Sequence, residues 1–407
     1  MPENRVAAKV NVSNQRILAR PLQLPCGVVL KNRMAKSAMS DSLGNGCGAP
    51  TDAQIRLYER WVEGGLALSI IGEVQGSPLY PEKPGNLVLN AHSEAEPFRA
   101  LARVGSINEA HLWLQLGHAG AMADAPISNP KGPSALDFPG LKCGALSVSE
   151  IKSLPEEFAR TAVLAKRFGF GGVEIHAAHG FLLSQFLSPL FNKRTDAYGG
   201  CLENRMRLLL ETVDTVRRAV GPDFPVGIKL NATDQLEGGF AQDEALAVVA
   251  ALDGTGIDLI DISGGTYFPG APSSSDRTGS GPYFLGFAAH ARAKTKKPLM
   301  VTGGFKTLQQ ATAAIEDGTA DLVGLARALV VDPDVPKKWE MGGVTEPKFP
   351  RFDSPPEGGV TAWYTMQITR IANEETALSP TDLAHAIKVY EERDQRRRQA
   401  WTAHFAK

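Results

Sequence analysis

The chain has 407 residues, and its 43 lysines and arginines against 44 aspartates and glutamates give a formal charge of −1 at pH 7. Hydrophobic residues make up 43% and charged residues 21% of the chain, a composition that is typical of a folded globular protein and excludes a largely disordered one. We expect no nucleic-acid partner, because neutralising phosphates requires a surplus of basic residues.

Residues 1–20 are polar, and no run of about 18 apolar residues occurs in the sequence. The four cysteines lie far apart and form no pair spaced for zinc or an iron–sulfur cluster. We therefore predict a cytoplasmic protein with reduced thiols, no membrane partner and no bound metal.

Short apolar, β-branched segments alternate along the chain with longer segments of helical periodicity. The predicted strands are Arg33–Met39, Leu66–Ile71, His111–Leu116, Gly172–Ala177, Val226–Asn231, Ile257–Ser263, Pro298–Thr302 and Asp321–Leu325. The predicted helices are Asp52–Glu63, Glu94–Ile107, Glu156–Phe168, Asn204–Val220, Asp243–Leu252, Gly286–Thr295 and Leu308–Asp317. This alternation predicts right-handed βαβ units and a parallel sheet.

Two closures of such a sheet are possible, an open doubly wound sheet or a (β/α)8 barrel. Eight predicted strands within roughly 300 residues favour the barrel, which typically takes about 250 residues plus insertions. The open alternative usually carries a GxGxxG motif after its first strand, whereas here the first strand runs into a loop of small residues that ends at Pro50. We therefore predict the α/β class and a (β/α)8 TIM barrel.

Two segments interrupt this regular pattern. Gly117–Glu150, after the third strand, is too long for a simple connection and is rich in Gly, Pro and Ala, so we predict an inserted loop or hairpin over the barrel mouth. We assign residues 1–340 to the barrel and residues 341–407 to a Pro/Gly-rich connector with a helical tail.

The helical tail is predicted from Leu383, Ile387 and Tyr390, which share one helix face behind the start signal Ser379-Pro380-Thr381-Asp382. We interpret the tail as a segment that wraps the barrel or joins it to a second copy of the chain, and not as an independent domain. The basic run Arg396–Arg398 is interpreted as a solvent-exposed face of this helix.

The active site of a (β/α)8 barrel lies at the carboxyl ends of its strands, and the loops after strands seven and eight commonly hold a phosphate. Strand seven ends in Gly303 and Gly304, whose backbone N–H groups can closely approach an anion. Strand eight leads through Gly324 to Arg327, which can add a charge-assisted hydrogen bond. Ordinary turn glycines are the alternative, but the two turns together indicate a phosphorylated cofactor.

Two histidines, His176 and His179, end the fourth strand, where their imidazoles can bond an anionic oxygen of a ligand. A structural pair is one alternative, and a metal site is another. The metal site would need a further ligand, and although His118 follows the third strand, no Asp, Glu or Cys lies at a supporting spacing.

Gln115 ends the third strand, and Lys229 lies among the apolar residues of the fifth. A buried lysine must be paired or functional, because burying its charge alone is costly, so a structural ion pair with Asp or Glu is the alternative to a role in binding. An amide and a cation at one barrel mouth suit a flavin, whose pyrimidine edge takes amide-like hydrogen bonds and whose reduced anion favours a nearby cation.

A series of motifs along the chain strengthens this interpretation. The motifs are Leu30–Met34, Trp113–Gly120, His176–Gly180, Phe186–Pro189, Asn192–Asp196, Tyr198–Gly200, Glu203–Arg205 and the two glycine turns. With them, the chain resembles the old yellow enzyme family from about Pro21 to Trp339, close to the barrel domain of 2,4-dienoyl-CoA reductases. The resemblance implies an FMN-dependent oxidoreductase on a (β/α)8 barrel, with NADPH or NADH as the reductant and a small-molecule electron acceptor.

The resemblance also implies roles for individual residues. Ser37, Ala38, Met39, Ser40 and Val74 would line the isoalloxazine, Gln115 would bond its pyrimidine edge, Lys229 would lie near N1 and O2, and Gly303, Gly304, Gly324, Ala326 and Arg327 would hold the phosphate. His176, beside the cofactor, and His179 would bind the carbonyl oxygen of an electron-poor acceptor such as an α,β-unsaturated carbonyl compound.

The chain departs from the family pattern two residues after His179. Many members have there a tyrosine that protonates the acceptor, and this chain has Phe181, which has no proton to donate. The alternative function is therefore a quinone reductase, or a reductase of other acceptors, with slow alkene reduction. A metal-dependent barrel enzyme and a non-catalytic flavin-binding protein are further alternatives.

Overall fold

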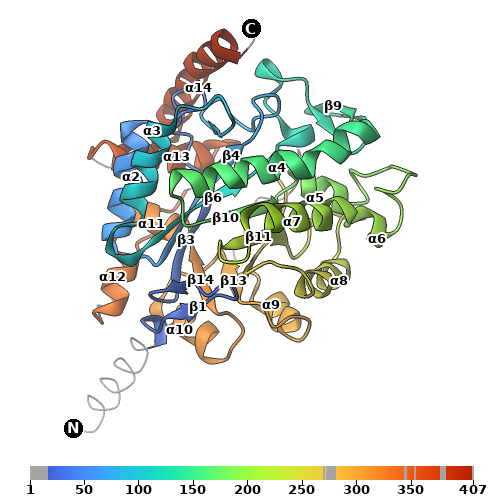
Figure 1. Ribbon diagram of the computed structural model, residues 1–407. Coiled ribbons are helices and arrows are strands. Elements are labelled where there is room, and N and C mark those ends of the chain that lie inside the picture. Colours follow the sequence, from blue (N-terminus) through green and yellow to red (C-terminus); the bar gives the residue numbers. More distant parts are fainter. Residues whose placement is uncertain are drawn as a thin grey trace, which may run out of the picture.

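Eight parallel strands form a closed barrel in the computed structural model of the chain, which describes residues 17–268, 271, 281–342, 346–352, 354–375 and 382–405 (Figure 1). The barrel strands are β3 (Met34–Ser40), β4 (Leu68–Gln75), β6 (His111–Leu116), β10 (Gly172–Ala177), β11 (Val226–Asn231), β12 (Leu259–Ser263), β13 (Leu299–Thr302) and β14 (Leu322–Leu325). Each strand pairs with the next along the chain, and β3 pairs with both β14 and β4, which closes the circle. The predicted (β/α)8 barrel is thus confirmed.

Helices surround this barrel and connect its strands (Figure 1). They are α2 (Asp52–Glu63), α3 (Ala95–Gly105), α4 (Val148–Phe168), α5 (Leu182–Leu187), α6 (Leu202–Arg205), α7 (Arg207–Val220), α8 (Gln242–Asp253), α9 (Leu285–Arg292), α10 (Leu308–Glu316), α11 (Arg327–Val331) and α12 (Val335–Glu340), with short 3-10 turns η1 (Ile107–Glu109), η2 (Gly120–Met122) and η3 (Ala125–Ile127). Short strands β1 (Leu22–Gln23) and β2 (Val29–Leu30) form an antiparallel pair, and β5 (Leu87–Val88) extends the sheet at β4.

The largest difference from the predicted helices is at α4, which begins at Val148 rather than at Glu156. Ser147 and Glu150 form a capping box, in which each side chain accepts a hydrogen bond from the other residue's backbone N–H. This box starts the helix inside the segment that was predicted to be an inserted loop, and Pro155 is accommodated within it.

The barrel interior is apolar at one end and polar at the other. Trp113, Met300 and Leu322 belong to the buried cluster that fills the amino-terminal end of the strands. Because side chains alternate along a strand, the residues two positions further on, including Gln115 and Thr302, also point inward and toward the mouth. The same alternation that builds the core therefore delivers polar side chains to the carboxyl ends of the strands.

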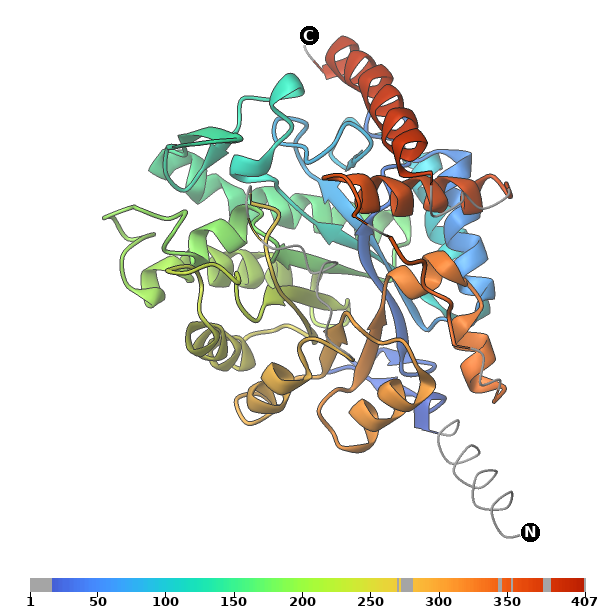
Figure 2. The same ribbon diagram turned by 180° about the vertical axis from the view of Figure 1, so that it is seen from behind.

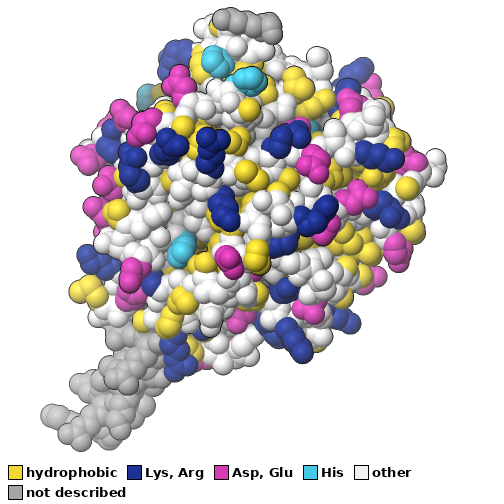
Figure 3. Space-filling view, in the orientation of Figure 1, with side chains coloured by type: hydrophobic (Ala, Val, Ile, Leu, Met, Phe, Trp, Pro, Cys, Tyr) yellow, Lys and Arg dark blue, Asp and Glu magenta, His cyan; other side chains and the backbone are white. Residues whose placement is uncertain are grey.

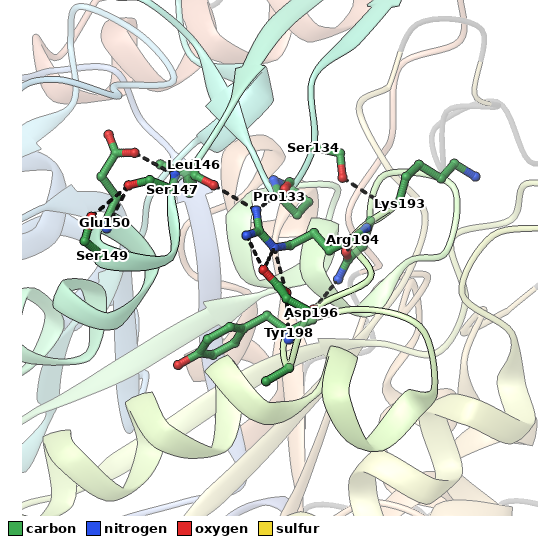
Figure 4. Close-up of polar contacts among 12 residues, drawn as sticks. Pro133, Ser134, Leu146, Ser147, Ser149, Glu150, Lys193, Arg194, Asp196 and Tyr198 are labelled. Carbon is green, nitrogen blue, oxygen red and sulfur yellow. Dashed lines mark hydrogen bonds and ion pairs between the residues drawn. The ribbon is translucent and has the colours of Figure 1, made fainter.

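The segment after β6 forms a small three-stranded sheet of β7 (Lys131–Gly132), β8 (Leu136–Phe138) and β9 (Leu141–Ala145), as expected for a hairpin insertion. Arg194, from the loop between α5 and α6, donates hydrogen bonds to the carbonyl oxygens of Pro133 and Leu146 and is paired with Asp196 (Figure 4). This contact fixes the insertion to the segment between α5 and α6.

The C-terminal segment lies against the barrel as two helices, α13 (Gly359–Ala372) and α14 (Leu383–Phe405) (Figure 2). Helix α13, which was not predicted, packs on α2 and α11, and α14 packs on α13. Of the start signal predicted for α14, Ser379, Pro380 and Thr381 lie outside the described residues. The idea that the tail joins two copies stays a prediction.

The interpretation of Arg396–Arg398 as solvent-exposed was wrong for two of its residues. Arg396 is exposed, but Arg397 donates a hydrogen bond to the carbonyl oxygen of Ser42, and Arg398 forms two with Asp124 at 2.8 and 3.0 Å. Each of these arginines joins α14 to a loop at the carboxyl ends of the strands, a long-range contact that no local pattern could indicate.

Acidic and basic side chains are interspersed over the face seen in Figure 3. None of the helices in the described part of the chain has the length and apolar character that crossing a bilayer requires.

Candidate active site

Six inward-facing side chains form a connected polar belt across the barrel. On one side, Gln115 on β6 donates a 2.7 Å hydrogen bond from Nε2 to Glu174 Oε1 on β10. Lys229 on β11 lies 4.0 Å from the same Glu174 oxygen and is hydrogen-bonded to Asp261 on β12. Adjacent strands thus alternate amide, acid, base and acid in the layer just above the apolar core.

The belt continues through two hydroxyl groups. Thr302 on β13 donates to Asp261 Oδ1 at 2.6 Å, and Ser37 on β3 lies 2.7 Å from the Thr302 hydroxyl. Gly324 on β14 separates these two hydroxyl-bearing strands, and a Cβ there would lie 2.3 Å from Thr302 Oγ1 and 2.4 Å from Ser37 Oγ. Glycine is needed at this position because the barrel interior has no space for a methyl group.

The charges in the belt depend on one another. Burial opposes the charged form of Lys229, but Asp261 and Glu174 outweigh it and raise the lysine pKa. Burial also raises the pKa of Glu174 to about 8, and Lys229 only partly offsets this. At neutral pH Lys229 is therefore charged and Glu174 is largely protonated. The structural ion pair that was the alternative role for Lys229 is present, with Asp261, and it is part of the polar belt that faces the mouth.

The structure does not bring Val74, the residue expected from strand two, to this group. Val74 pairs with Leu116 and Leu87 and belongs to the buried cluster outside the barrel wall. Gly72 occupies the inner position instead, because a Cβ there would lie 3.0 Å from Gln115 Oε1 and 3.2 Å from Ala38 Cβ. An irregularity in the pairing of β4 between Ile71 and Val74 changes the expected alternation.

His176 and His179 lie together above the belt, with ring centroids 5.3 Å apart. His176 Nε2 is 3.4 Å from Glu73 Oε1, and His179 Nε2 is 2.8 Å from the Ser263 hydroxyl. His179 has a positive φ of 61°, a conformation held by a hydrogen bond from its backbone N–H to Asn231.

Both imidazoles are neutral. Burial, reinforced by His179 and Lys229, lowers the pKa of His176 well below its ordinary value, and burial with Lys229 lowers the pKa of His179 to about 3. Two neutral rings can each donate one hydrogen bond to a ligand oxygen without placing a positive charge in the site. The pair is therefore suited to polarise a carbonyl group.

His118, the further ligand required by a metal site, has other contacts. Its ring stacks on Tyr80 at 4.5 Å, and its Nδ1 accepts a hydrogen bond from Gly120 N–H. Among the described residues, no group of three or more His, Cys, Asp or Glu side chains could hold a metal ion. His176 and His179 offer hydrogen-bond donors and Lys229 offers a positive charge, and these groups suit an organic anion or a carbonyl group.

The two glycine turns lie side by side, because Thr302 pairs with Gly324 in the barrel register. Gly303 and Gly304 have positive φ values of 107° and 84°, and a Cβ on Gly304 would lie 2.4 Å from the Gly281 carbonyl oxygen. Ala326 directly precedes α11, whose first residue is Arg327. The guanidinium of Arg327 lies 5.8 Å from the ring centroid of Tyr364 on α13, so the tail contributes to this end of the site.

Residues 37–40 are the end of β3, and their contact with a ligand stays a prediction. Sequence reasoning missed Asp261, Glu73 and Tyr267, which lie near the predicted residues in space. Asp261 carried a signal, because it is a lone charge in the apolar strand Leu259–Ser263. Tyr267 carried none, because it lies in a loop and its partners come from another part of the chain.

We expect the Lys229–Asp261 pair to affect both the stability of the protein and the redox potential of the flavin expected from the sequence. Lys229→Met should destabilise the protein by about 3–5 kcal/mol, because it leaves Asp261 buried without its counter-charge. The double variant Lys229→Met/Asp261→Asn should recover most of that loss, while the potential of the flavin expected from the sequence should stay below that of the wild type. Denaturant unfolding and a dye-linked reductive titration measure the two effects, and a wild-type potential in the double variant would make Lys229 purely structural.

Comparison with known proteins agrees with this geometry. The model of the NADH:flavin oxidoreductase / NADH oxidase family matches residues 18–346. The NADH-dependent flavin oxidoreductase iliE of Hypocrea jecorina (strain QM6a) is 34% identical over 353 residues, which cover 78% of this chain and 87% of that protein.

Two solved structures extend the likeness to the whole fold. Morphinone reductase has a TM-score of 0.69 at 27% identity, covering 82% of this chain and 91% of its own. A 2-naphthoyl-CoA reductase in complex with 2-naphthoyl-CoA has a TM-score of 0.79 at 25% identity, and the match covers 88% of this chain but 58% of that longer one.

The chain belongs to the NADH:flavin oxidoreductase / NADH oxidase family, the old yellow enzyme group. It is an NAD(P)H-dependent flavin oxidoreductase whose cofactor is FMN.

Proposed function

We propose that this enzyme reduces the activated carbon–carbon double bond of α,β-unsaturated carbonyl compounds. The observation that carries the proposal is the pair of neutral histidines, His176 and His179, above a belt that holds the buried cation Lys229. Two neutral donors at one point fit an acceptor with a carbonyl oxygen, and they become stronger partners as negative charge develops on that oxygen.

The residues present fit FMN by their chemistry. Gln115 and Lys229 offer an amide and a cation, and the glycine at position 72 places no side chain beside Gln115. Gly303, Gly304 and Arg327 would hold the phosphate with backbone N–H groups and one charge. Bound there, FMN supplies a hydride that NAD(P)H has delivered to it.

In this proposal the protein's own side chains bind and polarise the acceptor. His176 and His179 hold the acceptor's carbonyl oxygen, which draws electron density from the double bond toward that oxygen. Glu73 orients His176 through a contact of 3.4 Å, and Ser263 orients His179 through one of 2.8 Å. The second candidate, reduction of quinones, is favoured by Phe181, because a quinone is protonated on oxygen and needs no donor at carbon.

The test begins with the purified protein, which should be yellow and release FMN on denaturation. After anaerobic reduction by NADPH or NADH, mixing with cyclohexenone should reoxidise the flavin, and the product should be cyclohexanone. Benzoquinone is run in parallel. Reoxidation by the quinone alone would support the second candidate, whereas release of FAD, or no flavin uptake on reconstitution, would contradict both.

A further inference from the structure

The loop after β12 places a tyrosine beside the two histidines. The ring centroid of Tyr267 lies 5.7 Å from that of His179 and 6.0 Å from that of Phe181. Phe181 lies 5.0 Å from His176 and is 3% exposed, whereas Tyr267 is 64% exposed. Phe181 thus forms a closed wall beside the histidine pair, and Tyr267 stands next to it in the open mouth.

The backbone around Tyr267 is fixed by contacts on both sides. The Tyr267 N–H donates a 3.1 Å hydrogen bond to the carbonyl oxygen of His179, and the preceding Thr266 hydroxyl donates to the same oxygen at 3.4 Å. The junction is tight, because a Cβ on Gly180 would lie 2.1 Å from Thr266 Oγ1. The tyrosine is therefore held in register with the histidine that binds the acceptor.

The residue that follows is anchored in a different place. The ring of Phe268 packs against those of Phe191 and Phe138, at centroid distances of 4.6 and 5.7 Å, in the small core under the hairpin insertion. The Phe268 N–H also donates a 3.2 Å hydrogen bond to the Thr266 hydroxyl, so the chain is held on both sides of Tyr267. The exposed tyrosine is therefore positioned by its two neighbours.

The phenol has the chemistry that Phe181 lacks. An ordinary phenol has a pKa of about 10. The hydroxyl therefore stays protonated at any physiological pH and gives up its proton only to a strong base such as a developing carbanion. Its exposure allows water to restore the proton afterwards.

We propose that Tyr267 donates the proton to the α-carbon of the acceptor, in place of the hydroxyl that is absent at Phe181. Bound FMN would supply the hydride of NAD(P)H to the β-carbon. The π electron pair of the double bond would then take the Tyr267 proton at the α-carbon, so that one C–H bond forms at each carbon and the Tyr267 O–H bond breaks. The tyrosinate is then reprotonated by water. The proposal rests on the alkene reduction proposed above.

Tyr267→Phe tests it, with Tyr80→Phe as the matched control. Tyr80 is also partly exposed, but its ring stacks on that of His118, at a centroid distance of 4.5 Å. Tyr267→Phe should slow flavin reoxidation by cyclohexenone about 10²–10⁴-fold, the usual contribution of general acid catalysis, and reoxidation by benzoquinone less than about threefold. Tyr80→Phe should change neither rate.

A second readout separates proton donation from a role in shaping the pocket. If Tyr267 donates a proton, the affinity of the oxidised enzyme for a phenolic ligand should stay within about threefold in Tyr267→Phe, since general acid catalysis acts on the transition state. Phe181→Tyr added to Tyr267→Phe should restore much of the rate with cyclohexenone, because it returns a hydroxyl to the family's position. A large loss of ligand affinity without this rescue would overturn the proposal.

The outcomes also separate this proposal from the proposed function. If cyclohexenone reoxidises the wild type and Tyr267→Phe equally fast, only the role of Tyr267 fails. If cyclohexenone does not reoxidise the wild type, alkene reduction itself fails, and the role of Tyr267 fails with it.

Discussion

The double variant His176→Ala/His179→Ala is expected to retain FMN and to lose the long-wavelength charge-transfer band that phenolic ligands give with enzymes of this family. Each neutral imidazole can donate one hydrogen bond to the bound phenolate oxygen, and a hydrogen bond to a charged group contributes about 1.5–3 kcal/mol. Removing both should therefore weaken phenol binding by about 10²–10⁴-fold. Titration of the band with a para-substituted phenol measures the dissociation constant.

An exposed histidine provides the control for this double variant. His290, on α9, lies away from the mouth at the surface, so His290→Ala should bind phenol like the wild type. Retention of phenol binding in the double variant would show that the anion site lies elsewhere. Loss of FMN from it would instead show that the pair supports the cofactor.

Gly324→Ala should destabilise the protein by about 1–3 kcal/mol or more, the usual cost of adding a methyl group to a packed interior. The new Cβ would lie 2.3 Å from Thr302 Oγ1 and 2.4 Å from Ser37 Oγ, so the hydroxyl contact that joins β3 to β13 must break or the strands must separate. We expect a lower midpoint of urea unfolding and a reduced FMN content, because the belt below the cofactor is displaced.

Gly286→Ala is the matched control, because it adds the same methyl group where no atom lies within 4 Å. Gly286 lies within α9, so alanine should leave the protein unchanged or stabilise it by up to about 1 kcal/mol. Adding Ser37→Ala to Gly324→Ala should recover part of the loss, since it removes one of the two clashing oxygens. Equal unfolding midpoints for Gly324→Ala and wild type would refute the argument that the interior has no space.

The local sequence pattern predicted the barrel well, because each strand and each helix depends on the spacing of its own apolar residues. Helix α2 spans Asp52–Glu63 as predicted, with Thr51 as its cap, and β6, β10 and β11 also match their predicted ranges. The predicted and observed helices differ where apolar periodicity does not mark the helix start. The capping box at Ser147 moved the start of α4, and α13 had no predicted start at Gly359.

The same distinction holds for the site. By itself, the sequence determined which residues reach the mouth: Gln115 and Lys229 are polar residues on apolar strands, and His176 follows at the end of another. Only the tertiary structure decided their partners, because Gln115 meets Glu174 across 59 positions and Lys229 meets Asp261 across 32. Such pairs form when strands distant in sequence become neighbours in the closed barrel, and no local periodicity encodes that register.

Tyr267 shows this most clearly. The sequence determined that Phe181 has no proton to donate, since that follows from the identity of one residue. It could not place a hydroxyl from another loop beside Phe181, because that depends on the contacts of Thr266 with His179 and of Phe268 with the hairpin insertion. The sequence thus determined the barrel and the residues at its mouth, whereas the packing of loops from separate βα units decided which side chains meet there.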